Sequence, residues 1–235
     1  MTSTTKVSSR RISTGLSSLL SNSTPSSNQN LKINIDSRHT CYAVLRSKGG
    51  SGEVHTVKKL VDELITAGNN VLVCYEQHIE DDHLVTQYFT SPCNKVITMD
   101  QVAKNKNGII NCNWTNTSCM SELSAALDNT ERDYSIIFTC GTSSAGRLQS
   151  RINSISEFCN KIFISVNADV ENSIEPCRRL LLNDELDLKK INLSWWYRHD
   201  FSTHLLANIS IFDLEKLSVN ELNFKTKNTT IATFL

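Results

Sequence analysis

The sequence predicts an α/β protein built on a doubly wound, mainly parallel sheet with helices on both faces. Continuous apolar runs alternate along the chain with segments of helical period, which is the pattern of parallel strands joined by crossover helices. A glycine-rich turn joins the first apolar run to the first helical segment. At 235 residues the chain is long enough for one substantial domain and too short for two large ones.

The first unit of this pattern lies between residues 39 and 76. HTCYAVLR (39–46) predicts a strand, and NNVLVCYE (69–76) predicts a second strand of the fully buried type. Between them VHTVKKLVDELITAG (54–68) predicts a helix, because Val57, Leu60, Val61 and Leu64 form one apolar stripe. Gly68 stands where a helix C-terminus favours glycine.

The same alternation continues to about residue 222. Strands are expected at KVITMD (95–100), DYSIIFTC (133–140), KIFISVNA (161–168) and, as the last strand, INLSWWYR (191–198). Helices are expected at SCMSELSAALDN (118–129), LQSRINSISEFC (148–159), IEPCRRLLLNDEL (174–186) and FDLEKLSVNEL (212–222). The third of these has Pro176 in its first turn, where proline is tolerated.

The composition divides the chain into one domain, residues 31–225, and two tails. Residues 1–30 are rich in Ser and Thr and are expected to be disordered, and residues 226–235 form a polar tail. The first tail holds candidate interaction residues, two basic and three apolar at helical spacing: Arg10, Arg11, Leu16, Leu19 and Leu20. An Arg- and Ser-rich, acid-poor tail also resembles an organelle transit peptide, and both readings stay open.

Charge and cysteine usage favour a cytoplasmic protein. The 24 basic and 24 acidic residues leave no net charge to attract nucleic acid, and no apolar run reaches the ~18–20 residues of a membrane span. Eight cysteines without a C-x-x-C pair predict reduced thiols that act as small buried hydrophobes. The acid- and histidine-rich loop at residues 78–83 is expected to be solvated, so no metal is predicted there.

The most specific local pattern is SKGGSGEVH, residues 47–55. The common phosphate loop reads G-x-x-x-x-G-K-[ST], and here its first glycine, lysine and hydroxyl are missing. What remains is Lys48-Gly49-Gly50-Ser51-Gly52, which resembles the start of the deviant K-G-G-x-G-K-[ST] motif of the ParA/MinD family of ATPases. The order of strands around it, VLVCYEQ and then DYSIIFTC, is similar to that family's layout.

This resemblance implies a Rossmann-like P-loop NTPase fold and a degenerate nucleotide loop made of Lys48, Gly49, Gly50, Ser51 and Gly52. Glu53 stands at the place of the cradling lysine, and Phe138 or Thr139 at the place of the metal-side aspartate. A carboxylate beside a triphosphate replaces an attraction by a repulsion, on the order of a few kcal/mol per close charge pair. Phosphoryl transfer depends on charge neutralisation, so no competent ATPase, catalytic residue or metal site is expected.

The resemblance then implies an interaction protein. It would dimerise, or pair with an active ATPase or an assembly complex, in plasmid partition or in envelope secretion or polysaccharide machinery. The expected cofactor is none, or weakly bound ATP or ADP through the loop N–H groups.

Two alternatives remain open. Gly50-Ser51-Gly52-Glu53-Val54-His55 matches the dinucleotide fingerprint G-x-G-x-x-G except at its end, and Glu76 follows the second strand where a ribose-binding acid would lie. A Rossmann-type dinucleotide- or nucleotide-sugar-binding enzyme is therefore the second candidate. His55 would obstruct the close helix–strand packing that the last glycine allows. The third candidate is a glycine turn with a purely structural role.

Two further sites come from position in the predicted sheet. Cys140 and the hydroxyls that follow it lie at the carboxyl edge, where ligands often bind, but no base accompanies them. Trp195 and Trp196 are candidate interaction residues, because neighbours in a strand face opposite ways. One indole is expected in the core and the other on the surface.

Overall fold

The computed structural model describes residues 35–76, 95–140, 148–167, 173–183, 186–199, 202–216 and 234. All of these belong to one unit of the chain, Ile33–Leu235. The candidate interaction residues of the first tail lie outside the described residues: Arg10, Arg11, Leu16, Leu19 and Leu20. In the described part, no helix combines the length and apolar character needed to cross a membrane.

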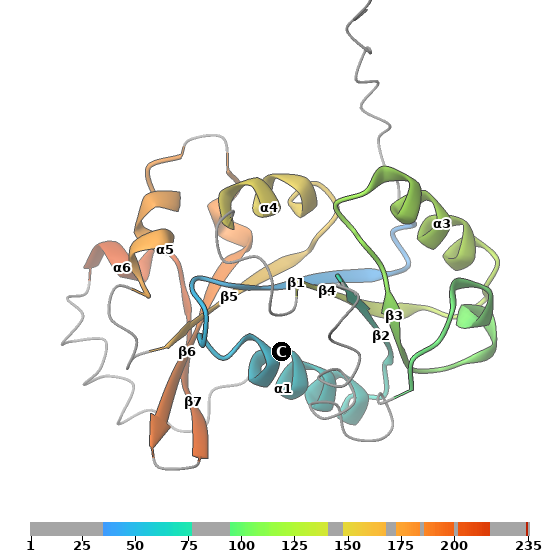
Figure 1. Ribbon diagram of the computed structural model, residues 1–235, viewed down its shortest axis with the longest axis horizontal. Helices are drawn as coiled ribbons and strands as arrows, with labels where there is room; N and C mark the ends of the chain where they lie inside the picture. Colours follow the sequence, from blue (N-terminus) through green and yellow to red (C-terminus); the bar gives the residue numbers. More distant parts are fainter. Residues whose placement is uncertain are drawn as a thin grey trace, which may run out of the picture. The chain divides into compact units, whose positions relative to one another are not determined.

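Seven strands form one sheet in the order β3-β2-β4-β1-β5-β6-β7 (Figure 1). Neighbouring strands are parallel from β3 to β6, and β7 runs antiparallel to β6. This confirms the predicted doubly wound, mainly parallel sheet. The strands are β1 (Thr40–Arg46), β2 (Asn70–Tyr75), β3 (Gly108–Asn111), β4 (Tyr134–Thr139), β5 (Lys161–Asn167), β6 (Ile191–His199) and β7 (Ser202–Ser210).

Helices cover both faces of the sheet. Helix α1 (Glu53–Thr66) lies on one face, and α3, α4 and α5 lie on the other (Figure 1). These three span Thr117–Asp128, Leu148–Ile155 and Glu175–Leu180. Shorter helical segments are η1 (Met99–Lys104), η3 (Leu188–Lys190) and α6 (Asp213–Lys216).

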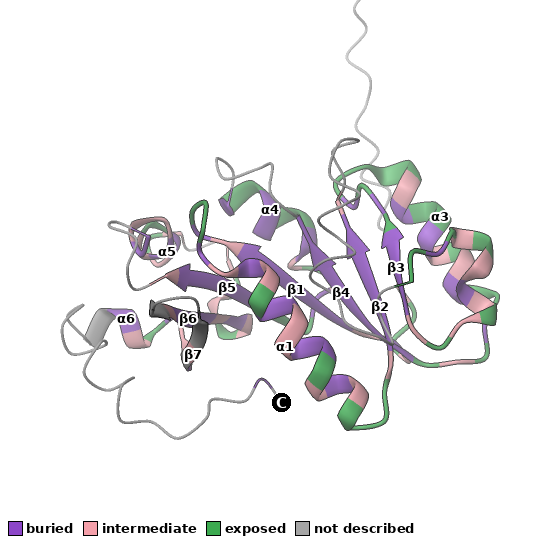
Figure 2. Ribbon diagram, turned by 60° about the horizontal axis from the view of Figure 1, so that its bottom comes forward, coloured by how far each residue is buried: buried purple, intermediate pink, exposed green. Residues whose placement is uncertain are grey.

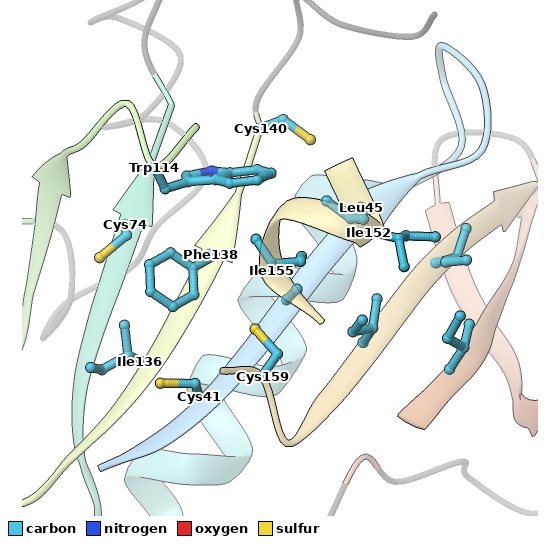
Figure 3. Close-up of a cluster of buried hydrophobic side chains, with 14 of the residues drawn as sticks. Cys41, Leu45, Cys74, Trp114, Ile136, Phe138, Cys140, Ile152, Ile155 and Cys159 are labelled. Atoms are coloured by element: carbon cyan, nitrogen blue, oxygen red, sulfur yellow. The ribbon is translucent and has the colours of Figure 1, made fainter. Parts of the chain in front are cut away.

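The central strands are mainly apolar because both of their faces are covered. In β1, Cys41, Ala43 and Leu45 pack on the side of α3, α4 and α5, while Tyr42 and Val44 pack on the side of α1. Figure 2 shows these strands buried along their length, and Figure 3 shows part of the larger apolar layer, with side chains from β1, β4 and α4. Cys41, Cys74, Cys140 and Cys159 all lie in this layer as free thiols, as predicted.

Helix α1 begins and ends close to the expected places. Its predicted stripe, Val57, Leu60, Val61 and Leu64, is buried against the sheet. Gly68 has a φ of +85°, and the chain leaves the helix there through two bonds, Gly68 N–H to Ile65 O and Asn69 N–H to Leu64 O. These two hydrogen bonds satisfy carbonyl groups that would otherwise lack a partner at the end of the helix. Glycine is favoured at position 68 because other residues rarely adopt a left-handed φ.

The structure corrects several expected elements. Residues 95–100 are not a strand, because Val96 forms an isolated bridge to Ile109 and the chain then enters η1. The strand in this region is β3, which the sequence analysis missed. β6 is not the last strand, since β7 follows it. Helices α4 and α5 are also shorter than expected, ending at Ile155 and Leu180.

Phe234 packs into the α1 side of the sheet. Its ring meets Phe163 of β5 edge to face at 4.9 Å, and only 2% of the residue is exposed. Its backbone N–H donates to Glu63 Oε2 at 2.7 Å, which ties this position to α1. A residue far along the chain therefore completes the core cluster around α1.

Replacing Phe234 by alanine should lower the free energy of unfolding by about 3 kcal/mol, the usual cost of removing a buried phenyl ring. Urea unfolding followed by circular dichroism measures the change. Phe212, which is 38% exposed, gives the matched control, and Phe212→Ala should change stability by less than about 1 kcal/mol. Equal losses in the two variants would contradict the packing described here.

Candidate functional site

The glycine-rich loop lies at the carboxyl end of β1, between the ends of β4 and β5. Ser47 fastens it to β5, because both its backbone N–H and its hydroxyl donate to Ser165 O, at 3.1 and 3.0 Å. Asn167 Nδ2 donates to Gly50 O at 3.0 Å. A turn follows Lys48, closed by Ser51 N–H donating to Lys48 O at 3.2 Å. The loop is thus held by the neighbouring strand.

Two of its glycines have a conformational reason to be there. Gly50 and Gly52 have φ values of +75° and +87°, in the left-handed region that other residues rarely adopt. Gly52 also faces Trp196 of β6 so closely that an added Cβ would lie 2.9 Å from the indole Cγ. Gly49 has open space around it.

Trp196 holds the start of α1 through a short polar network. Its indole Nε1 donates to the Thr56 hydroxyl at 2.6 Å, and that hydroxyl lies 2.7 Å from Ser165 Oγ. Thr56 N–H donates to Gly52 O at 2.9 Å, which closes the first turn of the helix. The loop, α1, β5 and β6 are therefore joined by buried hydrogen bonds and one aromatic contact.

Glu53, the first residue of α1, turns its side chain into the protein. The residue is only 6% exposed, and Oε1 accepts hydrogen bonds from the Thr139 hydroxyl at 2.5 Å and from Cys140 N–H at 3.0 Å. Oε2 lies 3.9 Å from Arg46 Nε. This carboxylate thus binds the carboxyl ends of β4 and β1, beside the loop.

A second buried ion pair lies at the same edge of the sheet. Arg151 of α4 contacts Glu76, just after β2, with Nη1 2.5 Å from Oε2. The guanidinium lies over the ring of Trp114, 5.2 Å from its centroid, and Trp114 Nε1 donates to Thr139 O at 3.1 Å. Figure 3 shows Trp114 and Cys140 at this end of the apolar layer. The sequence analysis did not identify Arg46, Trp114 or Arg151 as part of this site.

Burial raises the pKa of Glu53 above its ordinary value, although the bonds from Thr139 and Cys140 and the charge of Arg46 act in the opposite direction. Burial, followed by the nearby Glu53, raises the pKa of the Cys140 thiol as well. Because a thiolate is the nucleophilic form, this environment does not activate Cys140. Within the described ranges, no group of three or more His, Cys, Asp or Glu side chains has the geometry to hold a metal ion.

The predicted loop residues lie together, in two different environments. Lys48, Gly49 and Gly50 are exposed, whereas Ser51 is buried. The Ser51 hydroxyl has no hydrogen-bond partner among the described residues. Of the two residues expected at the metal-side position, Phe138 points into the core, against Trp114 and Phe158, and Thr139 bonds to Glu53.

The expectation for the two tryptophans was half wrong. They face opposite sides of the sheet, Trp195 toward α3, α4 and α5 and Trp196 toward α1. Neither is on the surface, because they are only 1% and 4% exposed. Trp195 packs in the apolar layer on the side of α3, α4 and α5, and Trp196 packs against Gly52 and Thr56, so neither indole offers an interaction surface.

The residues proposed for dinucleotide binding have other contacts. Glu76 is paired with Arg151, and its side chain is 12% exposed. His55 is exposed, and the centroid of its ring lies 5.7 Å from that of Trp196. The expectation that His55 would obstruct the packing of α1 on the sheet was therefore wrong. Thr56 takes the inward position. The acid- and histidine-rich loop at 78–83 lies outside the described residues.

No protein-family model matches the chain, and no curated protein does. Among solved structures it is similar to a ParA family ATPase from Chlorobium tepidum TLS, with 14% sequence identity, a TM-score of 0.47 and 83% of each chain covered.

Gly52→Ala should destabilise the protein by about 1–3 kcal/mol, since the new Cβ meets Trp196 and the backbone stays in a strained conformation. Chemical unfolding measures the loss. Gly49→Ala is the matched control in the same loop, where the added methyl meets open space. If the two variants were equally stable, the contact with Trp196 would not constrain the loop.

The buried Glu53 predicts an unusual dependence of stability on pH. Its raised pKa means that the folded protein holds this proton to higher pH than the unfolded chain, whose carboxyl titrates near 4.5. The contribution of Glu53 to stability is then complete below that pH and falls as pH rises through its folded pKa. Relative to the wild type, Glu53→Gln should therefore gain stability as pH rises above about 4.5.

Unfolding free energies measured at several pH values for both proteins test this. Asp62→Asn, on the exposed side of the same helix, is the control. It should show a much flatter difference from the wild type over this range. A difference for Glu53→Gln that stays constant, or that falls with pH, would contradict the raised pKa.

Proposed function

We propose that this chain is a catalytically inactive relative of ParA/MinD-type ATPases that acts by protein–protein interaction. The observation that carries the proposal is the position of the Glu53 carboxylate. It begins α1 directly after the K-G-G-x-G loop and accepts bonds from Thr139 and Cys140 at the end of β4. A nucleotide-hydrolysing site needs a cation at the first position and a metal ligand at the second.

The local charges support this reading. Above its raised pKa Glu53 is ionised, so a bound triphosphate would have to approach a buried carboxylate. Like charges at close range repel by on the order of a few kcal/mol. The Thr139 hydroxyl and the Cys140 N–H already donate to Glu53, so these donors are occupied by the protein itself. Arg46 lies against the same carboxylate. Internal contacts thus take over the groups that would otherwise serve a ligand.

Weak nucleotide binding remains part of the proposal. The start of the 14-residue helix α1 and the exposed Lys48 are features that favour an anion. ATP or ADP would then bind through the outer part of the loop, without turnover. Such binding would serve as a conformational signal.

The proposed action is self-association, or pairing with an active ATPase or an assembly complex. Plasmid partition and envelope secretion or polysaccharide machinery are the systems that the loop resemblance suggests. The seven described cysteines are all free thiols, the usual state in the reducing cytoplasm, where we place this action. A dinucleotide-binding enzyme is less well supported, because the candidate ribose acid Glu76 is held in a buried ion pair.

Calorimetry and an ATP turnover assay test the catalytic half of the proposal. The wild-type protein should bind MgATP no more tightly than about 1 mM and release no phosphate above a protein-free blank. Glu53→Gln removes the buried charge and should strengthen ATP binding about tenfold or more, still without turnover. Asp62→Asn removes a charge from the exposed face of the same helix and should leave the affinity unchanged.

Multiple turnover by the wild-type protein would overturn the proposal. Equal effects of the two substitutions would show that ATP does not approach Glu53. Sedimentation velocity tests the other half, since a self-associating protein should sediment as a dimer at micromolar concentration with or without nucleotide. A monomer at every concentration would leave pairing with a second protein as the remaining mode.

A further inference from the structure

A pair of thiols lies apart from the loop, at the junction of β3 and α3. Cys112 directly follows β3, and Cys119 is the third residue of α3. Their sulfur atoms are 3.2 Å apart, with the Cys119 thiol donating toward Cys112. Cys112 is fully buried and Cys119 is half-buried. Among the cysteines that the structure describes, Cys119 alone is not fully buried.

The backbone holds the two sulfurs close together. Cys112 N–H donates to Tyr75 O at 2.9 Å, and Trp114 N–H donates back to Cys112 O at 2.8 Å. At the other end the Asn116 side chain caps α3, accepting from Ser118 N–H and Cys119 N–H at 2.9 and 3.4 Å. The short connection is therefore fixed at both ends, and the proximity of the thiols follows from it.

We propose that Cys112 and Cys119 form a thiol–disulfide exchange site that is oxidised by a low-molecular-weight disulfide such as oxidised glutathione. A disulfide has a sulfur–sulfur distance of about 2.05 Å, so the two atoms need to approach by about 1.2 Å. Rotation of the two side chains can close this distance, whereas two thiols far apart in the fold would need the backbone to move. The bond would join the end of β3 to the first turn of α3.

The chemistry takes two exchange steps. Cys119 loses its proton to solvent, and its thiolate attacks one sulfur of the glutathione disulfide. That sulfur–sulfur bond breaks, a mixed disulfide forms on Cys119, and one glutathione leaves as a thiolate that takes up a proton. Cys112 then loses its proton and attacks Cys119 Sγ, which releases the second glutathione. Two protein thiols are oxidised to one disulfide, and one glutathione disulfide is reduced to two thiols.

The surroundings make the exchange slow and dependent on pH. Burial, together with the bond to Cys112, raises the pKa of Cys119 to about 12. The thiolate is the attacking form, so its fraction, and with it the rate, should rise about tenfold per pH unit below that value. Cys112 also lies within hydrogen-bonding reach of Cys74, a fully buried thiol of β2, which is the competing partner.

The site is connected to the loop region through Trp114. Its backbone N–H bonds to Cys112 O, and its indole donates to Thr139 O, the residue whose hydroxyl bonds to Glu53. Oxidation at residues 112 and 119 would therefore act on the segment that carries Trp114. In a reducing compartment such a disulfide is transient and reports the redox state.

The test treats the folded full-length protein, first reduced and then freed of reductant, with oxidised glutathione at pH 8. Non-reducing peptide mapping by mass spectrometry should find Cys112 linked to Cys119, with the mass of two hydrogens lost, and dithiothreitol should reverse it. Between pH 7 and 9 the initial rate should rise about tenfold per unit. Linkage of Cys74 to Cys112, or no reaction at Cys119, would overturn the proposal.

Three variants assign the steps. Cys112→Ser should accumulate the mixed disulfide on Cys119, because the resolving thiol is gone, whereas Cys119→Ser should form neither product. Cys159→Ser, at a buried thiol of the same apolar layer, is the control and should behave like the wild type. A mixed disulfide on Cys112 in the Cys119→Ser variant, formed as fast as the wild-type disulfide, would contradict the assignment. If the Cys112 variant does not fold, mapping of the wild-type linkage decides alone.

Discussion

The buried carboxylate of Glu53 is the constraint on which the organisation of this protein depends. Its two oxygens join three elements, because one accepts from Thr139 and Cys140 at the end of β4 and the other faces Arg46 at the end of β1. A carboxylate taken out of water costs free energy unless hydrogen bonds or charges compensate it. Here both kinds of compensation come from the carboxyl edge of the sheet, where a doubly wound fold usually receives its ligand.

Among the described residues, the buried carboxylates at this edge of the sheet are paired with arginines. Beside Glu53 and Arg46 lies the pair of Glu76 and Arg151, with the guanidinium over Trp114. Each carboxylate has an arginine, and each arginine is largely shielded from solvent. An arrangement of this kind fixes the ends of β1, β2 and β4 relative to α1 and α4.

The sequence was sufficient for the central layer of the fold. Strands β1, β2, β4 and β5 are covered on both faces, so each is a mainly apolar run that can be recognised without knowledge of its neighbours. β3 was missed because only four residues form it, and β7 because its serines, histidine and asparagine interrupt the apolar pattern. Both depend on pairing with another strand, which no local window contains.

The candidate site was less accessible to the same reasoning. The loop and the unusual Glu53 are visible in nine consecutive residues, 47–55. The direction in which Glu53 points is decided by Thr139, which is 86 positions away. In the same way one of Trp195 and Trp196 was expected on the surface, but both are buried, and the neighbour of Trp196 across the fold is a glycine without a side chain. Arg46 pairs with Glu53 from the end of β1, but the sequence does not show which of the nearby charges, Arg46 or Lys48, faces the buried acid.

The contact between Gly52 and Trp196 has a consequence for the history of the loop. The indole fills the space that any side chain at position 52 would need, and its N–H is bonded to Thr56 one turn into α1. A smaller residue at 196 would open a hole over the glycine, whereas a side chain at 52 would displace the indole and would also have to adopt the left-handed φ. Loss of the indole therefore does not by itself permit a side chain at position 52, and changes in this loop are expected at 196 before 52.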